Sequence, residues 1–154
     1  MGDINDYETK VTIIFPTKNE ESTIEGCIKA ARESKYHPHI IVVDGFSGDK
    51  TREIAEELGV EIIIPTSRKF PGKGIGMATA LKKALLDNPD IILFLDADIK
   101  NITYEWVDKL VDPIIEGRYD MVRGQYRRAP RDAAVTKLIA RPLLKTFFPE
   151  IPYL

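Results

Sequence analysis

The sequence has little that would suit an extracellular, membrane or nucleic-acid-binding protein. Among 154 residues Cys27 is the single cysteine, which excludes a disulfide or a thiolate metal cluster within the chain. No apolar run approaches the roughly 20 residues that span a bilayer, and the polar segment 1–10 lacks the apolar core of a signal peptide. The net charge of −2 is unlike the strongly basic surface of a general nucleic-acid binder. We therefore expect a cytoplasmic protein with no transmembrane segment and no nucleic-acid partner.

What the chain does have is the pattern of an α/β domain. Short apolar runs alternate with amphipathic segments of helical period, and the runs lie at 11–15, 40–43, 60–64 and 91–95. Because these runs are mostly apolar rather than alternating, they predict strands that are buried on both faces, as in a mainly parallel sheet. A fifth short strand is predicted at 121–124. The sequence therefore predicts a Rossmann-like α/β fold with helices on both faces of the sheet.

The third predicted helix depends on a stripe of apolar residues with helical spacing. These residues are Ile75, Ala78, Leu81 and Leu85. They recur at intervals of three and four residues, which places them on one side of a helix. We expect this side to face the sheet.

Polar loops follow three of the predicted strands. They are Thr17–Glu21 after the first strand, Asp44–Asp49 after the second and Asp96–Asp98 after the fourth. In an open α/β sheet, ligands bind in the crevice at the carboxyl ends of the strands. The three loops should therefore converge on one site.

Asp96 and Asp98 are the strongest candidates for metal binding. With one small residue between them at the end of a strand, both carboxylates should point the same way. Such a pair can hold a hard divalent cation whose open positions take phosphate oxygens. An isolated Asp-x-Asp is more often a solvated strand end or a capping turn, so the surrounding loops must decide between the two interpretations.

A nucleoside diphosphate fits the other polar residues near the predicted crevice. Asp44 can accept a hydrogen bond from a uracil N–H, and Asn19 and Glu20 can hold the base or ribose. Lys73, between two glycines, can approach the phosphates closely and offset their charge. The alternatives are turn formation for Asp44 and a solvated loop lysine for Lys73.

Two other sites for phosphate or metal find little support. The segment Gly72–Gly76 has neither the P-loop spacing nor the dinucleotide-binding spacing, and it follows the third strand. His37 and His39 flank a proline in a connecting loop, on the far side of the sheet from the paired aspartates. We expect both histidines to be surface residues.

The chain changes character after residue 117. Eight basic and two acidic residues lie between 118 and 145, and the last residues, 147–154, are largely apolar. We expect a polar tail at 1–10, a nucleotide-binding domain at 11–124, and a basic segment with a helix at 125–154. The apolar end predicts either a homodimer contact or a fold that continues in a segment outside this chain.

The loop motifs resemble those of GT-A fold glycosyltransferases of the family-2 type. The resemblance covers residues 11–124 and rests on four motifs in the family's order, at Phe15–Glu21, Val42–Asp49, Gly72–Gly74 and Phe94–Asp98. Beyond it, residues 122–126 and 135–144 are similar to the segment that follows in glucosyl-3-phosphoglycerate synthases and their mannosyl relatives.

The resemblance implies a retaining transfer of a hexose from a UDP- or GDP-sugar to a small anionic acceptor such as 3-phosphoglycerate, with Mg²⁺ or Mn²⁺. It implies that Asp96 and Asp98 bind the metal and, with Lys73, are catalytic. The implied nucleotide-binding residues are Pro16, Thr17, Asn19, Glu20, Asp44, Ser47, Lys73, Asp96 and Ala97. The implied acceptor-binding residues are Arg128, Arg131, Val135 and Thr136.

Two departures from the family pattern leave alternatives open. Ala133-Ala134 stand where the synthases have a glycine and an arginine that helps to hold the acceptor. The family also has a further C-terminal segment, with a histidine that completes the metal site, and this segment is not in the chain. One alternative is therefore a nucleotide-sugar-binding module without turnover. A nucleotidyltransferase of related fold is another, although Thr17–Glu21 is not the Gly-rich, Arg-bearing loop that such an enzyme needs.

Overall fold

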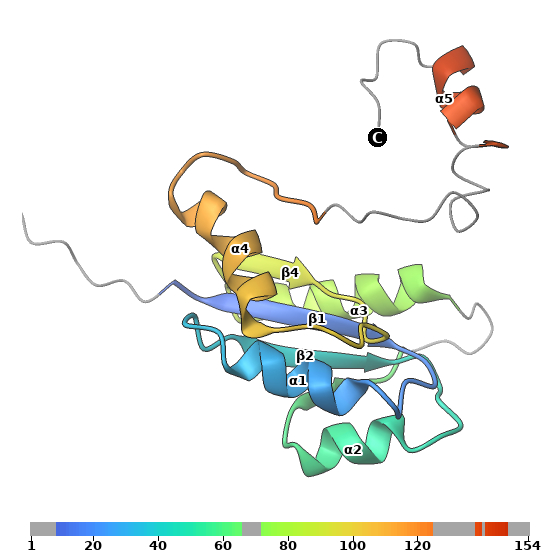
Figure 1. Ribbon diagram of the computed structural model, residues 1–154. Coiled ribbons are helices and arrows are strands. Elements are labelled where there is room, and N and C mark those ends of the chain that lie inside the picture. The colour runs from blue at the N-terminus through green and yellow to red at the C-terminus, as the bar shows by residue number, and fades with distance from the viewer. Residues whose placement is uncertain (1–8, 66–71, 125–137, 140, 148–154) are drawn as a thin grey trace, which may run out of the picture. The chain divides into compact units, whose positions relative to one another are not determined.

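The computed structural model describes residues 9–65, 72–124, 138–139 and 141–147. The chain divides into two compact units, Met1–Val122 and Arg123–Leu154. Strands and helices alternate in the first unit (Figure 1), in the order β1 (Val11–Thr17), α1 (Ile24–Arg32), β2 (His39–Asp44), α2 (Thr51–Glu57), β3 (Glu61–Ile63), α3 (Lys73–Leu86), β4 (Ile91–Phe94) and α4 (Tyr104–Ile115). This alternation confirms the predicted α/β class.

The four strands form one parallel sheet in the order β3-β2-β1-β4. β1 is central and pairs with β2 on one side and with β4 on the other. Its register places Thr17 opposite Asp44 and Ile14 opposite Phe94. The loops that leave β1, β2 and β4 therefore begin at the same edge of the sheet.

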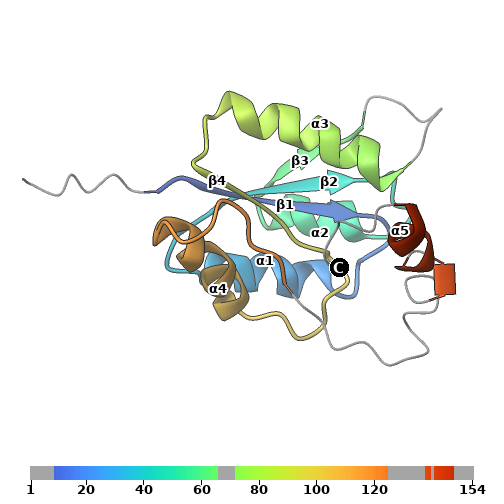
Figure 2. The same ribbon diagram turned by 90° about the horizontal axis from the view of Figure 1, so that it is seen from above.

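Helices cover both faces of the sheet, as Figure 2 shows. Ile13 and Phe15 of β1 belong to a buried cluster that includes residues of α1, α2 and α4. Ile14 of β1 belongs to a second, smaller cluster with Val43 and with alanines of α3. Successive residues of a strand point to opposite faces, so the uninterrupted apolar run of β1 supplies both cores.

The prediction for the buried side of α3 was wrong. Its buried residues are Gly76, Ala80 and Ala84, whereas Ala78 and Leu85 of the predicted stripe are exposed. Small side chains at intervals of four residues let the helix backbone approach the sheet closely. A Cβ atom at Gly76 would lie 3.2 Å from Val43 Cγ1. The helix therefore packs through its smallest residues and leaves Leu85 in solvent.

Two predictions about strands also need correction. β4 is an edge strand among the described residues, so Phe94 is 37% exposed and Ile92 and Leu93 are only partly buried, not buried on both faces. Residues 121–124 adopt no strand conformation. Met121 there is 82% exposed, and an apolar segment that pairs with no neighbouring strand gains no ladder hydrogen bonds.

In the second unit, the structure describes a helix α5 at Arg141–Phe147. The predicted acceptor residues Arg128, Arg131, Val135 and Thr136 lie outside the described residues. Most of the apolar end at 147–154, on which the homodimer prediction depends, also lies outside them. None of the helices in the described part of the chain has the length and apolar character needed to cross a membrane.

Two leucine substitutions on α3 test which side of the helix is buried. We expect Ala80→Leu to lower the free energy of unfolding by about 1–3 kcal/mol, because the added atoms overpack the contact with the sheet. The matched substitution Ala78→Leu, on the exposed side, should change it by less than about 0.5 kcal/mol. Urea denaturation of both variants measures the difference. Equal effects would contradict the observed orientation of α3.

Candidate functional site

A cavity of about 390 Å³ lies at the carboxyl ends of β1 and β2, beside the start of α3 and the turn after β4. Its wall combines acidic, basic and apolar groups from loops that are far apart in the sequence. The lining residues are Pro16, Thr17, Lys18, Glu20, Val43, Gly45, Phe46, Pro65, Gly72, Lys73, Ile75, Gly76, Asp96, Ala97 and Asp98. The structure thus brings together seven of the ten predicted metal- and nucleotide-binding residues.

Asp96 and Asp98 present their carboxylates on one side of the chain after β4. The chain after β4 stays paired with β1 for one more residue, because the Leu95 N–H donates to Ile14 O at 3.1 Å. Leu95 and Ala97 are buried in the core, whereas both aspartates are exposed and line the cavity. The alternation of a strand therefore continues into this turn and aims the two acidic side chains away from the core.

The buried thiol of Cys27 contacts the backbone of the same turn from the core side. Cys27 is a buried residue of α1, and its Sγ lies 3.5 Å from both Ala97 O and Ile99 O. These carbonyl groups flank Asp98. Cys27 is thus a small core residue, and its thiol adds a weak hydrogen bond between α1 and the acidic turn.

Glu20 completes an acidic group in the cavity. Its pKa is raised from the ordinary value of 4.5, first by partial burial and then by the negative charges of Asp98, Asp49 and Asp96. The backbone N–H of Glu20 donates to Thr51 Oγ1 at 2.7 Å, which fixes the loop at that position. The carboxylates share one space and repel one another. The metal ligands that they offer are all oxygen atoms, which Mg²⁺ and Mn²⁺ prefer. The residues present therefore fit a hard divalent cation.

Lys73 places a positive charge beside this acidic group. It is the first residue of α3, and its Nζ forms an ion pair with Asp96 Oδ1. Gly72 caps the start of the helix, and its carbonyl accepts from the Ile75 and Gly76 N–H groups. Lys73 thus reaches across the cavity from a fixed backbone, and its side chain remains about half exposed.

Asn19, Asp44 and Ser47, three of the predicted nucleotide-binding residues, do not line the cavity but link its loops. The Asn19 N–H donates to Ser47 Oγ at 2.9 Å, and the Gly48 N–H donates to Asn19 Oδ1 at 2.8 Å. The buried Asp44 accepts from the Ser47 N–H at 3.1 Å. Asn19 has a positive φ of 59°, a conformation that asparagine tolerates better than most residues. These bonds join the loops after β1 and β2.

Several lining residues were not predicted from the sequence, among them Lys18, Gly45 and Phe46. A Cβ atom at Gly45 would lie 3.0 Å from Thr17 O, whose carbonyl accepts from the Gly45 N–H at 2.8 Å. The sequence signal for this close approach was the glycine directly after Asp44. Phe46 has a φ of 61°, which is strained for a bulky residue and is common where a loop is shaped for a ligand.

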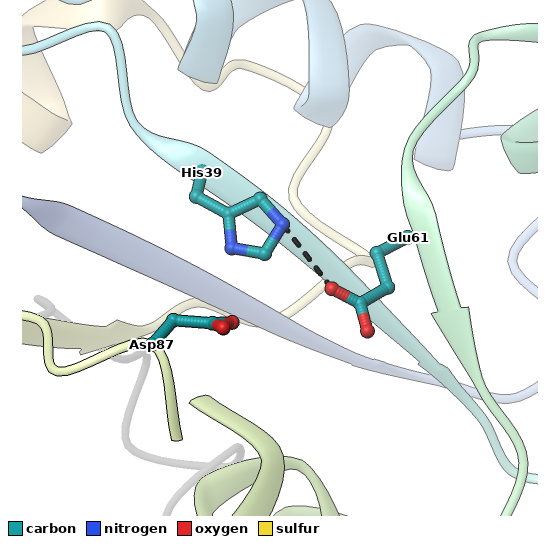
Figure 3. A group of neighbouring side chains, drawn as sticks. All are labelled: His39, Glu61 and Asp87. Atoms are coloured by element: carbon teal, nitrogen blue, oxygen red, sulfur yellow. Dashed lines mark ion pairs between the residues drawn. The ribbon is translucent and has the colours of Figure 1, made fainter. Parts of the chain in front are cut away.

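A second group of metal-ligating side chains lies at the opposite ends of the strands (Figure 3). His39 Nε2 is 3.2 Å from Glu61 Oε2, and Asp87 lies near both. Lys83 Nζ lies 3.5 Å from Glu61 and 3.6 Å from Asp87. The carboxylates therefore already have a cation as partner, and His39 is exposed as predicted.

Comparison with known proteins points to one family. The family model for Glycosyl transferase family 2 matches residues 12–151. Glucosyl-3-phosphoglycerate synthase of Petrotoga mobilis is 33% identical, over 94% of this chain and 50% of its own. Glycosyltransferase AglJ of Haloferax volcanii is 36% identical, over 83% of this chain and 40% of its own.

The fold also matches solved structures. Glucosyl-3-phosphoglycerate synthase from Mycobacterium tuberculosis, in complex with Mn²⁺, UDP and glucosyl-3-phosphoglycerate, has a TM-score of 0.77 and 31% identity, over 92% of this chain and 51% of that one. The complex of the same enzyme with Mg²⁺ and UDP has a TM-score of 0.76 and 30% identity, over the same shares of the two chains. This chain spans about half the length of these relatives, and within that half it has the GT-A fold. The chain belongs to glycosyl transferase family 2.

Proposed function

We propose that this chain provides the donor-binding half of a metal-dependent glycosyltransferase. The reaction would transfer a hexose from a nucleotide-diphospho-sugar to a small anionic acceptor such as 3-phosphoglycerate. The observation that carries the proposal is the convergence of Asp96, Asp98, Glu20 and Lys73 on one cavity at the carboxyl ends of the strands. Family membership and the relatives' complexes with UDP and Mn²⁺ or Mg²⁺ support it.

The acidic turn is proposed to hold the cation. Asp96 and Asp98 would bind Mg²⁺ or Mn²⁺, and the cation would supply the electrostatic stabilisation that a departing diphosphate requires. Lys73 would bind a phosphate oxygen of the donor, since its exposed ammonium lies in the same cavity. The cation and Lys73 together would offset the negative charge of the diphosphate, while the carboxylates would hold the cation.

The loops after β1 and β2 are proposed to hold the nucleoside. Pro16, Thr17 and Glu20 line the cavity, and Asp44 ends β2 between the lining residues Val43 and Gly45. The Asp44 carboxylate would accept a hydrogen bond from the uracil N–H. Asn19 and Ser47 would shape the loop through their mutual hydrogen bond. UDP in the relatives' structures favours a uridine donor over a guanosine donor.

The acceptor half of the proposal rests on sequence and relatives. The basic segment that follows Gly117 suits an acceptor with phosphate and carboxylate groups, and Arg128, Arg131, Val135 and Thr136 remain the proposed acceptor residues. A structure of the mycobacterial relative contains phosphoglyceric acid. The retaining stereochemistry is proposed from the resemblance. The nucleotidyltransferase alternative has no support among the relatives named above, which are glycosyltransferases.

Calorimetric titration of UDP tests the metal-dependent donor site. We expect UDP to bind the 154-residue chain in Mn²⁺ and to bind Asp96→Asn/Asp98→Asn at least about tenfold more weakly, because the cation loses its ligands. In EDTA the double variant should bind UDP no more weakly than the wild type, because without a cation the two carboxylates only repel the diphosphate. The control Asp87→Asn removes an exposed carboxylate at the other end of the strands and should leave UDP affinity unchanged. Equal affinity of the double variant and the wild type in Mn²⁺ would refute the site.

The pH dependence of stability tests the acidic group. The folded protein raises the pKa of Glu20 above 4.5 and therefore favours the protonated carboxyl group. The free energy of unfolding should fall as the pH rises from 4.5 through the raised pKa, because Glu20 then ionises less readily in the folded than in the unfolded state. Glu20→Gln has no such ionisation. In EDTA, we expect this variant to gain in free energy of unfolding relative to the wild type at pH 7 but not at pH 4. Urea denaturation at both pH values measures this change, and a constant difference would contradict the raised pKa of Glu20.

A further inference from the structure

We propose that Lys73 and the divalent cation compete for the carboxylate of Asp96, and that the nucleotide diphosphate relieves this competition by binding Lys73. Metal and nucleotide would then bind cooperatively, each strengthening the binding of the other. The inference rests on the proposed function, since it assumes that Asp96 is a metal ligand and that Lys73 binds phosphate.

The contact that carries the inference is the ion pair between Lys73 Nζ and Asp96 Oδ1. This is the carboxylate that the cation needs. Lys18 and Lys73 both line the cavity. Of these two described lysines, Lys73 forms the ion pair with the acidic turn. A cation bound to Asp96 must share the carboxylate with the ammonium or displace it.

The side chain of Lys73 can leave Asp96 while its backbone stays in place. The Lys73 and Asp96 side chains are 56% and 52% exposed, so solvent can replace either partner at little cost. The backbone of α3 is held close to the sheet, because Gly76 is buried against Val43 and Pro65. Exchange between Asp96 and a phosphate oxygen therefore requires only rotation of the lysine side chain.

The charges at the site explain why the nucleotide should couple to the metal. A dication placed beside the ammonium group of Lys73 is repelled by it, and the repulsion offsets part of the attraction of Asp96 and Asp98. A diphosphate offers Lys73 several negatively charged oxygens and frees the Asp96 carboxylate for the cation. Because linkage is reciprocal, the factor by which UDP strengthens Mn²⁺ binding equals the factor by which Mn²⁺ strengthens UDP binding.

A simple additive site would behave differently from a competitive one. If Lys73 only bound phosphate, removing its charge would weaken UDP binding and leave the affinity for Mn²⁺ alone unchanged. If Lys73 instead oriented Asp96 for the metal, its removal would weaken Mn²⁺ binding. Competition alone predicts opposite changes in the two affinities, namely weaker UDP binding and tighter binding of Mn²⁺ alone.

The test is calorimetric titration of Mn²⁺ with and without UDP, on the wild-type chain and on Lys73→Met, which keeps the length of the side chain and removes its charge. We expect Lys73→Met to bind Mn²⁺ alone about threefold more tightly or better, which is the range of an exposed ion pair. UDP should strengthen Mn²⁺ binding by a smaller factor in the variant than in the wild type. Lys73→Gln and thermal denaturation confirm that the change reflects charge and not misfolding.

Two lysine variants serve as matched controls. Lys82→Met removes an exposed charge farther along the same helix, outside the cavity lining, and should leave both affinities unchanged. Lys18→Met removes the other lysine of the cavity wall and should raise the affinity for Mn²⁺ alone less than Lys73→Met does. An equal rise in the Lys18 variant would overturn direct competition at Asp96 in favour of a general effect of cavity charge.

The outcomes also separate the inference from the function on which it rests. If the wild type binds both UDP and Mn²⁺ but Lys73→Met binds Mn²⁺ alone no more tightly, the competition is refuted and the donor site stands. If the wild type binds neither ligand, alone or together, both the proposed function and the inference fail.

Discussion

The site depends on the register of a parallel sheet. β1 is hydrogen-bonded on both sides, and its pairing with β2 and β4 brings the ends of three strands to one edge. Thr17 and Asp44 end opposite one another, and the Leu95–Ile14 bond extends the alignment to the acidic turn. A slip of one residue in β4 would turn Asp96 and Asp98 toward the core and Leu95 toward solvent, because strand side chains alternate. Burial of Leu95 and Ala97 therefore fixes where the carboxylates point.

Much of this architecture could be predicted because its signals are local. Apolar runs mark strands wherever both faces are covered, and Asp, Asn, Gly and Lys in the following loops mark the edge at which a ligand binds. Features that depend on distant partners could not be predicted. The exposure of Phe94 follows from the place of β4 at the edge of the described sheet, and residues 121–124 pair with none of the described strands. The buried side of α3 consists of Gly76, Ala80 and Ala84, and a search for large apolar residues overlooks such a face.

The loops show the same division between local and distant signals. Their residue types indicated a nucleotide site, and most of the indicated residues line the cavity. The hydrogen bonds of Asn19 to Ser47 and Gly48 join loops about 28 residues apart, and spacing along the chain does not reveal them. These bonds join the two loops into one unit. Residues proposed to contact the nucleotide and residues that hold the loops in place are both polar. Sequence alone does not distinguish these two roles.

The close packing of α3 limits how the site can change in evolution. At Gly76 a single methyl group would already press on Val43, so substitutions on the buried face of the helix cannot move its first turn without disturbing the sheet. The distance between Lys73 and the acidic turn is thus inherited with the fold. Lys18 and Phe46 lie on loops that follow the strands, where side chains can be exchanged without moving the backbone of the core. Divergence in the preferred nucleotide or sugar would therefore arise in these loops, whereas the spacing of the proposed phosphate- and metal-binding residues would stay constant.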